Sequence, residues 1–266
     1  MIMKLLGCRS IRFIRYFSDV QKVTKFKPKA SRKINYCTPI LSEERKKSIN
    51  KIVALQISGR YLTCTSFLRD GNMLVDWKML CFPENMYKFN LNDIYNSVVD
   101  IMKDLPQGDA YLIENYMKMP SNVNVAGANL FYIKLQTLAM LIALINSSQM
   151  KDLSTNTNEK DSKVVLMKAR LHARLFRIIV GTEIISSQTI TESMLKGNFP
   201  EHITPITPGI DAVLTYNSVQ DPAIKELMSN GLMMALTFVN LVLNCNPNSL
   251  QALSTSYSKK LKSNKK

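Results

Sequence analysis

The chain has 266 residues, of which 46% are hydrophobic, so it can bury one sizeable core. Its five cysteines form no C-x-x-C pair and its two histidines, His172 and His202, have no helical ligand spacing, which argues against a zinc site, a disulfide framework and histidine-based metal chemistry. The net charge is +15, and the excess of basic residues lies near the two ends of the chain. Residues 1–50 hold 13 Lys/Arg against 3 Asp/Glu, whereas residues 51–257 hold 17 of each.

The first 18 residues predict a mitochondrial presequence. They contain no acid, and Lys4, Arg9, Arg12 and Arg15 recur among apolar residues at near-helical spacing. Arg15-Tyr-Phe-Ser18 also resembles a matrix-peptidase cleavage site. The alternative is a basic leader without a targeting role. We therefore expect a protein of the mitochondrial matrix.

Basic segments flank the predicted domain on both sides. Residues 19–48 have too few apolar side chains to pack and predict a flexible arm, either a solvated linker or a contact for phosphate backbones. The ordered domain is predicted over 49–245. A basic tail, 246–266, follows and ends in five lysines after Ser258.

Periodicity predicts the elements of the domain in chain order. The predicted strands are Lys51–Ser58, Tyr61–Leu68, Met73–Lys78, Asp109–Asn115 and Lys163–Met167. The predicted helices are Leu91–Met102, Gly127–Ile145, Ala169–Val180, Ile190–Lys196 with Thr189 as its cap, and Asp221–Leu243. The Asp70-Gly71 turn favours an antiparallel meander of the first three strands. A right-handed crossover then places the fourth strand parallel to the first.

Two of the predicted helices are unusually apolar. The helix at 127–145 would be a transmembrane span only if it were longer, and it contains Lys134, so we predict a buried core helix. The last helix is apolar nearly all round and must be buried on more than one side. Its methionines leave self-association as a homodimer, or docking on a polymerase, open beside core packing.

The order of these elements resembles the RNase H-like fold of Holliday-junction resolvases. The matching segments are Ile52 to Arg60, Met73-Leu-Val-Asp-Trp77 and Tyr111-Leu-Ile-Glu114. More closely, the span from about 48 to 243 resembles the carboxy-terminal domain of metazoan mitochondrial transcription elongation factors, with Val75-Asp-Trp77, Ala110–Glu114, Leu138–Leu144 and Val164–Lys168 as the supporting segments. The resemblance implies an α/β domain with a mixed five-stranded sheet and flanking helices. The family's helix-hairpin-helix module would not fit in the residues before this domain.

Nucleases of this fold hold two divalent cations between converging carboxylates. At the corresponding positions this chain has Gln56 on the first strand, Glu114 on the fourth and Asn230 in the last helix. One carboxylate is too few, so we expect no catalysis, no metal and no other cofactor. We expect Glu114 to be a solvated strand-end acid rather than a residual metal ligand. Substitutes that the sequence gives no reason to place beside it are Asp76, Asp109 and Asp211.

One basic stripe interrupts the neutral domain. Five cations and no acid occur within 15 residues: Lys163, Lys168, Arg170, Arg174 and Arg177. Arg170, Arg174 and Arg177 would share one face of the predicted helix, which indicates either nucleic-acid binding or a solvated surface. Arg60, in the first turn, is a weaker candidate.

The resemblance implies a non-catalytic elongation factor in the mitochondrial nucleoid. It would bind the single-subunit mitochondrial RNA polymerase, DNA and nascent RNA, and no membrane. Two alternatives stay open from the residues: an active mitochondrial resolvase-type nuclease, and a component of the mitochondrial ribosome or of RNA processing.

Overall fold

The computed structural model describes residues 35–84, 88, 90–115, 124–148, 162–180 and 183–254. The predicted presequence (1–18), the first part of the predicted arm and the terminal lysines lie outside the described residues.

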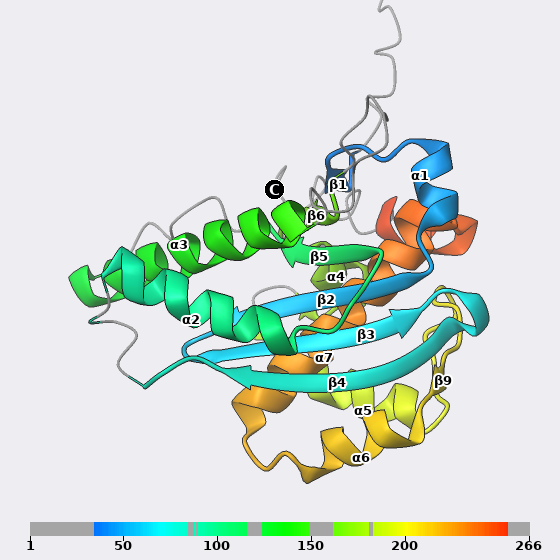
Figure 1. The fold of residues 1–266 in the computed structure, drawn as a ribbon. Coiled ribbons are helices and arrows are strands. Elements are labelled where there is room, and N and C mark those ends of the chain that lie inside the picture. Colours follow the sequence, from blue (N-terminus) through cyan, green and yellow to red (C-terminus); the bar gives the residue numbers. More distant parts are fainter. Residues whose placement is uncertain are drawn as a thin grey trace, which may run out of the picture. The chain divides into compact units, whose positions relative to one another are not determined.

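Seven strands form one mixed sheet (Figure 1), in the order β1-β6-β5-β2-β3-β4-β9. Their bounds are Cys37–Thr38 (β1), Lys51–Ser58 (β2), Tyr61–Leu68 (β3), Met73–Cys81 (β4), Ala110–Glu114 (β5), Val164–Met167 (β6) and Thr207–Pro208 (β9). The predicted meander and the parallel pairing of β5 with β2 are confirmed. The predicted number of five strands is wrong, because two-residue strands at the edges pair with β6 and β4. Strands this short leave no periodicity in the sequence.

Helices cover both faces of the sheet (Figure 1). One face carries α2 (Leu91–Asp104) and α3 (Val125–Ser148), which lie side by side over Val53 and Leu55 of β2. The other face, which includes Ile52 of β2, is covered by α4 (Leu171–Leu175), α5 (Ser187–Leu195), α6 (Ile210–Ser218) and α7 (Pro222–Phe238). A π-helical segment, Val239–Leu243, continues α7. Since successive side chains of a strand point to opposite faces, β2 is buried on both sides.

The helix predicted over Ala169–Val180 is wrong in length. Only Leu171–Leu175 is helical, because Arg177 adopts a left-handed conformation (φ 55°) and the N–H of Ile178 returns to the carbonyl of Ala173 at 2.9 Å. The β-branched residues that follow form a small hairpin of β7 (Ile179–Val180) and β8 (Glu183–Ile184).

Two other helices differ from the prediction. The start of α5 lies three residues before the predicted Ile190, because the cap is the Ser186 hydroxyl, which accepts the N–H of Gln188. The structure also adds α6, for which no helix was predicted. By contrast, the start of α7 is confirmed: Pro222 is its first residue, and the Asp221 carboxylate accepts the N–H of Ala223 at 2.8 Å.

The folded unit extends beyond 49–245 at both ends. Cys37–Thr38 pairs with β6, and the short helix α1 (Glu43–Ser48) donates from the Arg45 guanidinium to the carbonyl of Asp109 at 2.6 Å. The expectation of a flexible arm is therefore wrong for residues 35–48. A final helical segment, 247–254, buries Leu253 in the core. The backbone and a few apolar anchors hold these segments, so their composition alone did not reveal them.

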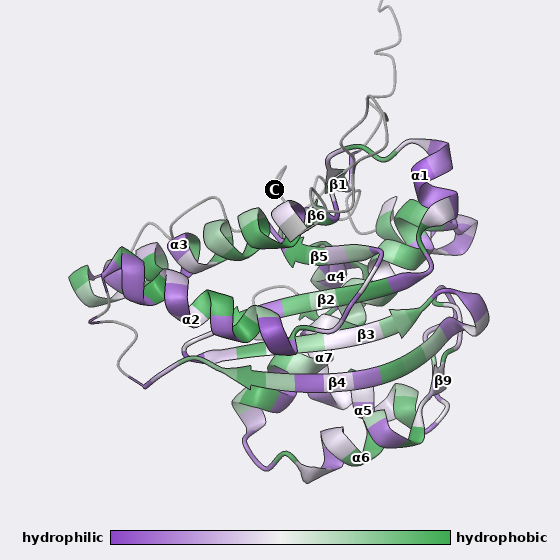
Figure 2. Cartoon of the chain, viewed as in Figure 1, coloured by the Kyte–Doolittle hydropathy of each residue, from purple (hydrophilic) through white to green (hydrophobic). Residues whose placement is uncertain are grey.

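The two apolar helices behave differently. Each is long and apolar enough to cross a membrane by length and composition alone. The window in α7 and its extension is 83% buried, whereas the window in α3 is only 22% buried. The prediction that α3 is a buried core helix is therefore wrong: it contacts the core through Leu138, Leu141 and Ile145 and exposes Val125, Leu130 and Tyr132. Figure 2 shows α3 as a largely hydrophobic helix.

Candidate functional site

Three positions are predicted from the sequence to correspond to the metal-binding acids of RNase H-like nucleases. Two of them, Gln56 and Glu114, lie at the ends of neighbouring parallel strands. Leu55 of β2 is in register with Ile113 of β5, so Gln56 and Glu114 come next on the two strands. Both are buried, and alternation turns them towards the sheet face that α7 covers.

The third position, Asn230, is on α7, where the helix lies closest to the sheet. The next residue, Gly231, faces Thr65 of β3 and the carbonyl of Ala54 on β2. An added Cβ at Gly231 would overlap the Thr65 hydroxyl. Glycine at this point therefore lets α7 approach the middle of the two central strands closely.

Glu114 is enclosed rather than solvated. Its side chain is 5% exposed, and its Oε1 accepts the backbone N–H of Arg170 at 2.5 Å. The expectation of a solvated strand-end acid is wrong, because the chain after β6 turns over the end of β5. That covering segment is 56 residues away in sequence, so the strand pattern could not reveal it.

His172 lies beside these polar residues, although its spacing in the sequence did not indicate a functional site. It is buried on α4, hydrogen-bonds Asn230 and lies near the carboxylates of Glu114 and Glu226. Burial lowers the pKa of His172, and the two carboxylates and Asn230 oppose this effect. The imidazole is thus held in its neutral form at pH 7.

The polar groups here are engaged with one another. Glu226 accepts the N–H of Ser187 at 3.0 Å and the hydroxyl of Ser186 at 2.8 Å, so it caps α5. Asn230 accepts the hydroxyl of Ser187 at 2.7 Å, and the Gln56 amide lies 3.6 Å from the sulfur of Met234. The group is a hydrogen-bonded network that joins α4, α5 and α7 to the sheet.

The acids considered as substitutes do not join Glu114, and Glu226, the other carboxylate near His172 among the described residues, already caps α5. Asp109 is at the opposite end of β5, where it accepts the backbone N–H groups of Asn50 and Lys51. Asp76 faces Ser66 within β4, and Asp211 is exposed on α6. Within the described ranges, no three His, Cys, Asp or Glu side chains are grouped so that they could hold a metal ion. The donor set therefore does not fit a two-metal centre.

The neutral state of His172 predicts a pH effect on stability. The unfolded chain should take up a proton near the ordinary histidine pKa of 6.5, whereas the folded chain resists it until a lower pH. The stability that comes from a neutral His172 should therefore be fully present above pH 6.5. The free energy of unfolding should decrease as the pH falls from 6.5 towards the pKa of His172 in the folded chain. Urea unfolding at several pH values measures this loss.

Substitutions of the two histidines provide the control for this pH effect. His172→Gln should reduce the loss between neutral and mildly acidic pH. His202→Gln, which changes the chain's other histidine, should leave the wild-type pH dependence in place. Equal pH dependence in the wild type and in His172→Gln would contradict the assignment.

The structure separates the predicted basic stripe into parts. Lys168 and Arg170 lie in the turn between β6 and α4, and this turn is here called the basic loop (Lys168–Arg170). Arg177 follows α4, and all three side chains are exposed. Arg174 is half-buried, and Lys163 lies at the opposite end of β6. The prediction that Arg170, Arg174 and Arg177 share one helical face is wrong, because Arg170 and Arg177 are left-handed residues outside α4.

The three exposed cations have no acidic partner. None of Lys168, Arg170 and Arg177 is in an ion pair within the part of the chain that the structure describes. Exposed cations that lack an ion pair are available to an anionic partner such as a phosphate backbone.

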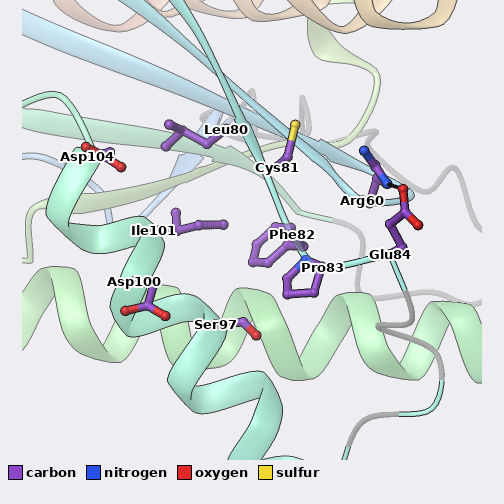
Figure 3. Close-up of a pocket in the computed structure, with 10 residues that line it drawn as sticks. All are labelled: Arg60, Leu80, Cys81, Phe82, Pro83, Glu84, Ser97, Asp100, Ile101 and Asp104. Carbon is purple, nitrogen blue, oxygen red and sulfur yellow. Dashed lines mark hydrogen bonds and ion pairs between the residues drawn. The ribbon is translucent and has the colours of Figure 1, made fainter.

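Arg60 lies in a different environment. It lines a cavity of 460 Å³ between the end of β4 and α2, on the sheet face away from Asn230 (Figure 3). Its guanidinium forms an ion pair with Glu84 at 2.6 Å and lies over the Tyr61 ring at 5.5 Å. The cavity walls include Leu80 and Phe82, which are buried. Arg60 is thus already paired and is not joined to the basic loop.

No family model matches this sequence, and no curated protein matches it significantly. The mixed α/β architecture therefore rests on the structure itself.

Proposed function

We propose that the chain is a non-catalytic mitochondrial transcription elongation factor with an RNase H-like pseudonuclease domain. It binds the single-subunit mitochondrial RNA polymerase together with DNA and nascent RNA and increases processivity. The chain order of β2 to β6 and the parallel pairing of β2, β5 and β6 support the RNase H-like assignment. The sequence resemblance over about 48 to 243 supports the family assignment.

The observation that carries the non-catalytic part is the state of Glu114. It is the one carboxylate among the three compared positions, and its oxygen already accepts the Arg170 N–H at 2.5 Å. Amides at Gln56 and Asn230 are acceptors without negative charge. Holding two hard cations against their hydration needs several charged oxygens, so these buried polar residues serve the fold rather than hydrolysis.

The binding part rests on the basic loop and Arg177. The basic loop directly follows β6, at the carboxyl end of the parallel strands, and its backbone covers Glu114; Arg177 is exposed after α4. The methionines of the last helix left core packing, self-association and docking on a polymerase open, and Met228, Met233 and Met234 are buried in the core. That helix therefore does not supply a docking surface for a second copy or for polymerase.

Recovery of partners from the mitochondrial matrix tests the function most directly. Affinity purification of the full chain should recover the mitochondrial RNA polymerase, and adding the protein to a run-off assay should increase the yield of long transcripts. Recovery of ribosomal proteins without polymerase would favour the ribosomal or RNA-processing alternative and contradict this proposal.

A cleavage assay separates the proposal from an active nuclease. The purified protein with Mg²⁺ or Mn²⁺ should leave branched DNA and RNA–DNA hybrids intact. Glu114→Gln should not differ from the wild type in this assay. Metal-dependent cleavage that Glu114→Gln abolishes would establish the nuclease alternative instead.

A further inference from the structure

We propose that Glu114 is a positioning residue for nucleic-acid binding, because it holds the basic loop in the conformation that presents Arg170. This inference rests on the proposed nucleic-acid-binding function and gives the buried carboxylate a role other than metal binding. The juxtaposition that carries it is Glu114 at the end of β5 against the backbone of Arg170 at the start of α4.

Backbone hydrogen bonds hold the two ends of the basic loop. Glu114 is in register with Met167, the last residue of β6. The Lys168 N–H then donates to the carbonyl of Tyr36 at 2.9 Å, and the Leu171 N–H donates to the carbonyl of Lys168 at 3.1 Å. Between these bonds, the Arg170 N–H donates to the carboxylate of Glu114. Glu114 is therefore the side chain that closes the turn.

The conformation of Arg170 needs such a partner. Its φ of 58° and ψ of 22° are left-handed, a region that side chains other than glycine avoid. A hydrogen bond from an N–H to a carboxylate is stronger than one between neutral groups and offsets this cost. The turn leaves Arg170 exposed while the next two residues, Leu171 and His172, are buried.

The surroundings of Glu114 explain why a carboxylate is tolerated in the interior. Lys134 of α3 is close enough for Glu114 to raise its pKa against the lowering effect of burial. Glu114 also raises the pKa of the buried His172 against the lowering effect of burial. The Glu114 side chain thus lies within electrostatic range of Lys134 and His172, and it accepts the Arg170 N–H of the loop.

The test compares Glu114→Gln, Arg170→Ala and the double variant in oligonucleotide binding over a range of salt concentrations. Arg170→Ala should reduce the slope of log K against log salt by about one unit, the loss of one phosphate contact. Glu114→Gln should reduce the slope in the same direction although it removes no surface charge. The double variant should bind as Arg170→Ala does, because Glu114 acts through Arg170.

Two controls separate positioning from general destabilisation. Glu226→Gln alters another carboxylate that holds backbone in the same network, the N–H of Ser187, and should leave the salt slope unchanged. In ¹⁵N-labelled protein, the amide resonance of Arg170 should move upfield in Glu114→Gln, as a bond to a charged acceptor is lost. This resonance reports the contact whatever the overall stability.

A wild-type salt slope in Glu114→Gln, beside a reduced slope in Arg170→Ala, would overturn the positioning role and leave the proposed function intact. An additive loss in the double variant would also overturn it. If the unsubstituted protein bound no nucleic acid, the proposed function itself would fail, and this inference with it.

Discussion

Replacing Lys168, Arg170 and Arg177 together by alanine is expected to weaken nucleic-acid binding by about two orders of magnitude near 0.1 M salt. Each cation that contacts a phosphate releases condensed counterions, so three lost contacts also flatten the salt dependence by about three units. All three side chains are exposed and none is in an ion pair within the described ranges. Fluorescence anisotropy with a labelled oligonucleotide at several salt concentrations measures both quantities.

A matched control removes the same net charge elsewhere. Lys46, Arg60 and Lys103 are each paired with a carboxylate, Glu43, Glu84 and Asp100 respectively, at 2.6 to 2.7 Å. The Lys46→Ala, Arg60→Ala, Lys103→Ala variant should keep most of the affinity, because these cations are already satisfied. An equal loss of affinity in the two triple variants would mean that total charge, and not the basic loop with Arg177, governs binding.

Gly231→Ala is expected to lower the free energy of unfolding by about 1–3 kcal/mol, the usual cost of overpacking a core. The new Cβ would overlap the Thr65 hydroxyl on β3 and would also lie only 3.3 Å from the Thr65 Cβ, so rotation of the threonine side chain alone does not relieve the contact. A gain in helix propensity from alanine offsets only part of this cost. Urea unfolding followed by far-UV circular dichroism measures the change.

Thr65→Ala provides the test of mechanism for this prediction. The Thr65 hydroxyl is buried with no hydrogen-bond partner among the described residues, so its removal breaks no bond. In the Thr65→Ala background, the nearest remaining atom to the added Cβ is the residue-65 Cβ at 3.3 Å, which a small adjustment accommodates. Gly231→Ala should therefore cost much less in that background. Full additivity of the two substitutions would refute the steric explanation.

The central strands were predictable because their signals are local. The run of β-branched and aliphatic residues in Lys51–Ser58 and the Asp70-Gly71 turn before Met73 specify a strand and a hairpin within a few residues. The crossover rule then placed β5 parallel to β2. The parallel pairing of β2 with β5 also makes Gln56 and Glu114 neighbours, since side chains at the carboxyl ends of paired parallel strands lie together.

The surroundings of those side chains were not predictable. Arg170 meets Glu114 across 56 positions of sequence, and His172 meets Asn230 between α4 and α7. Neither contact follows a spacing rule, because each depends on how α4 packs against the sheet. In the structure α4 ends at Leu175, so Arg170 and Arg177 lie outside it and do not share a helical face with Arg174.

By itself, the sequence determined the class of the fold, the order of its central strands and the shortage of acids at the compared positions, since periodicity, turn residues and side-chain charge are local properties. Only the tertiary structure decided that the remaining carboxylate of Glu114 is buried against Arg170, and that α3 rather than α7 exposes an apolar face. The physical reason is that burial and hydrogen-bond partners depend on distant segments, whose approach is set by the packing of whole helices on the sheet.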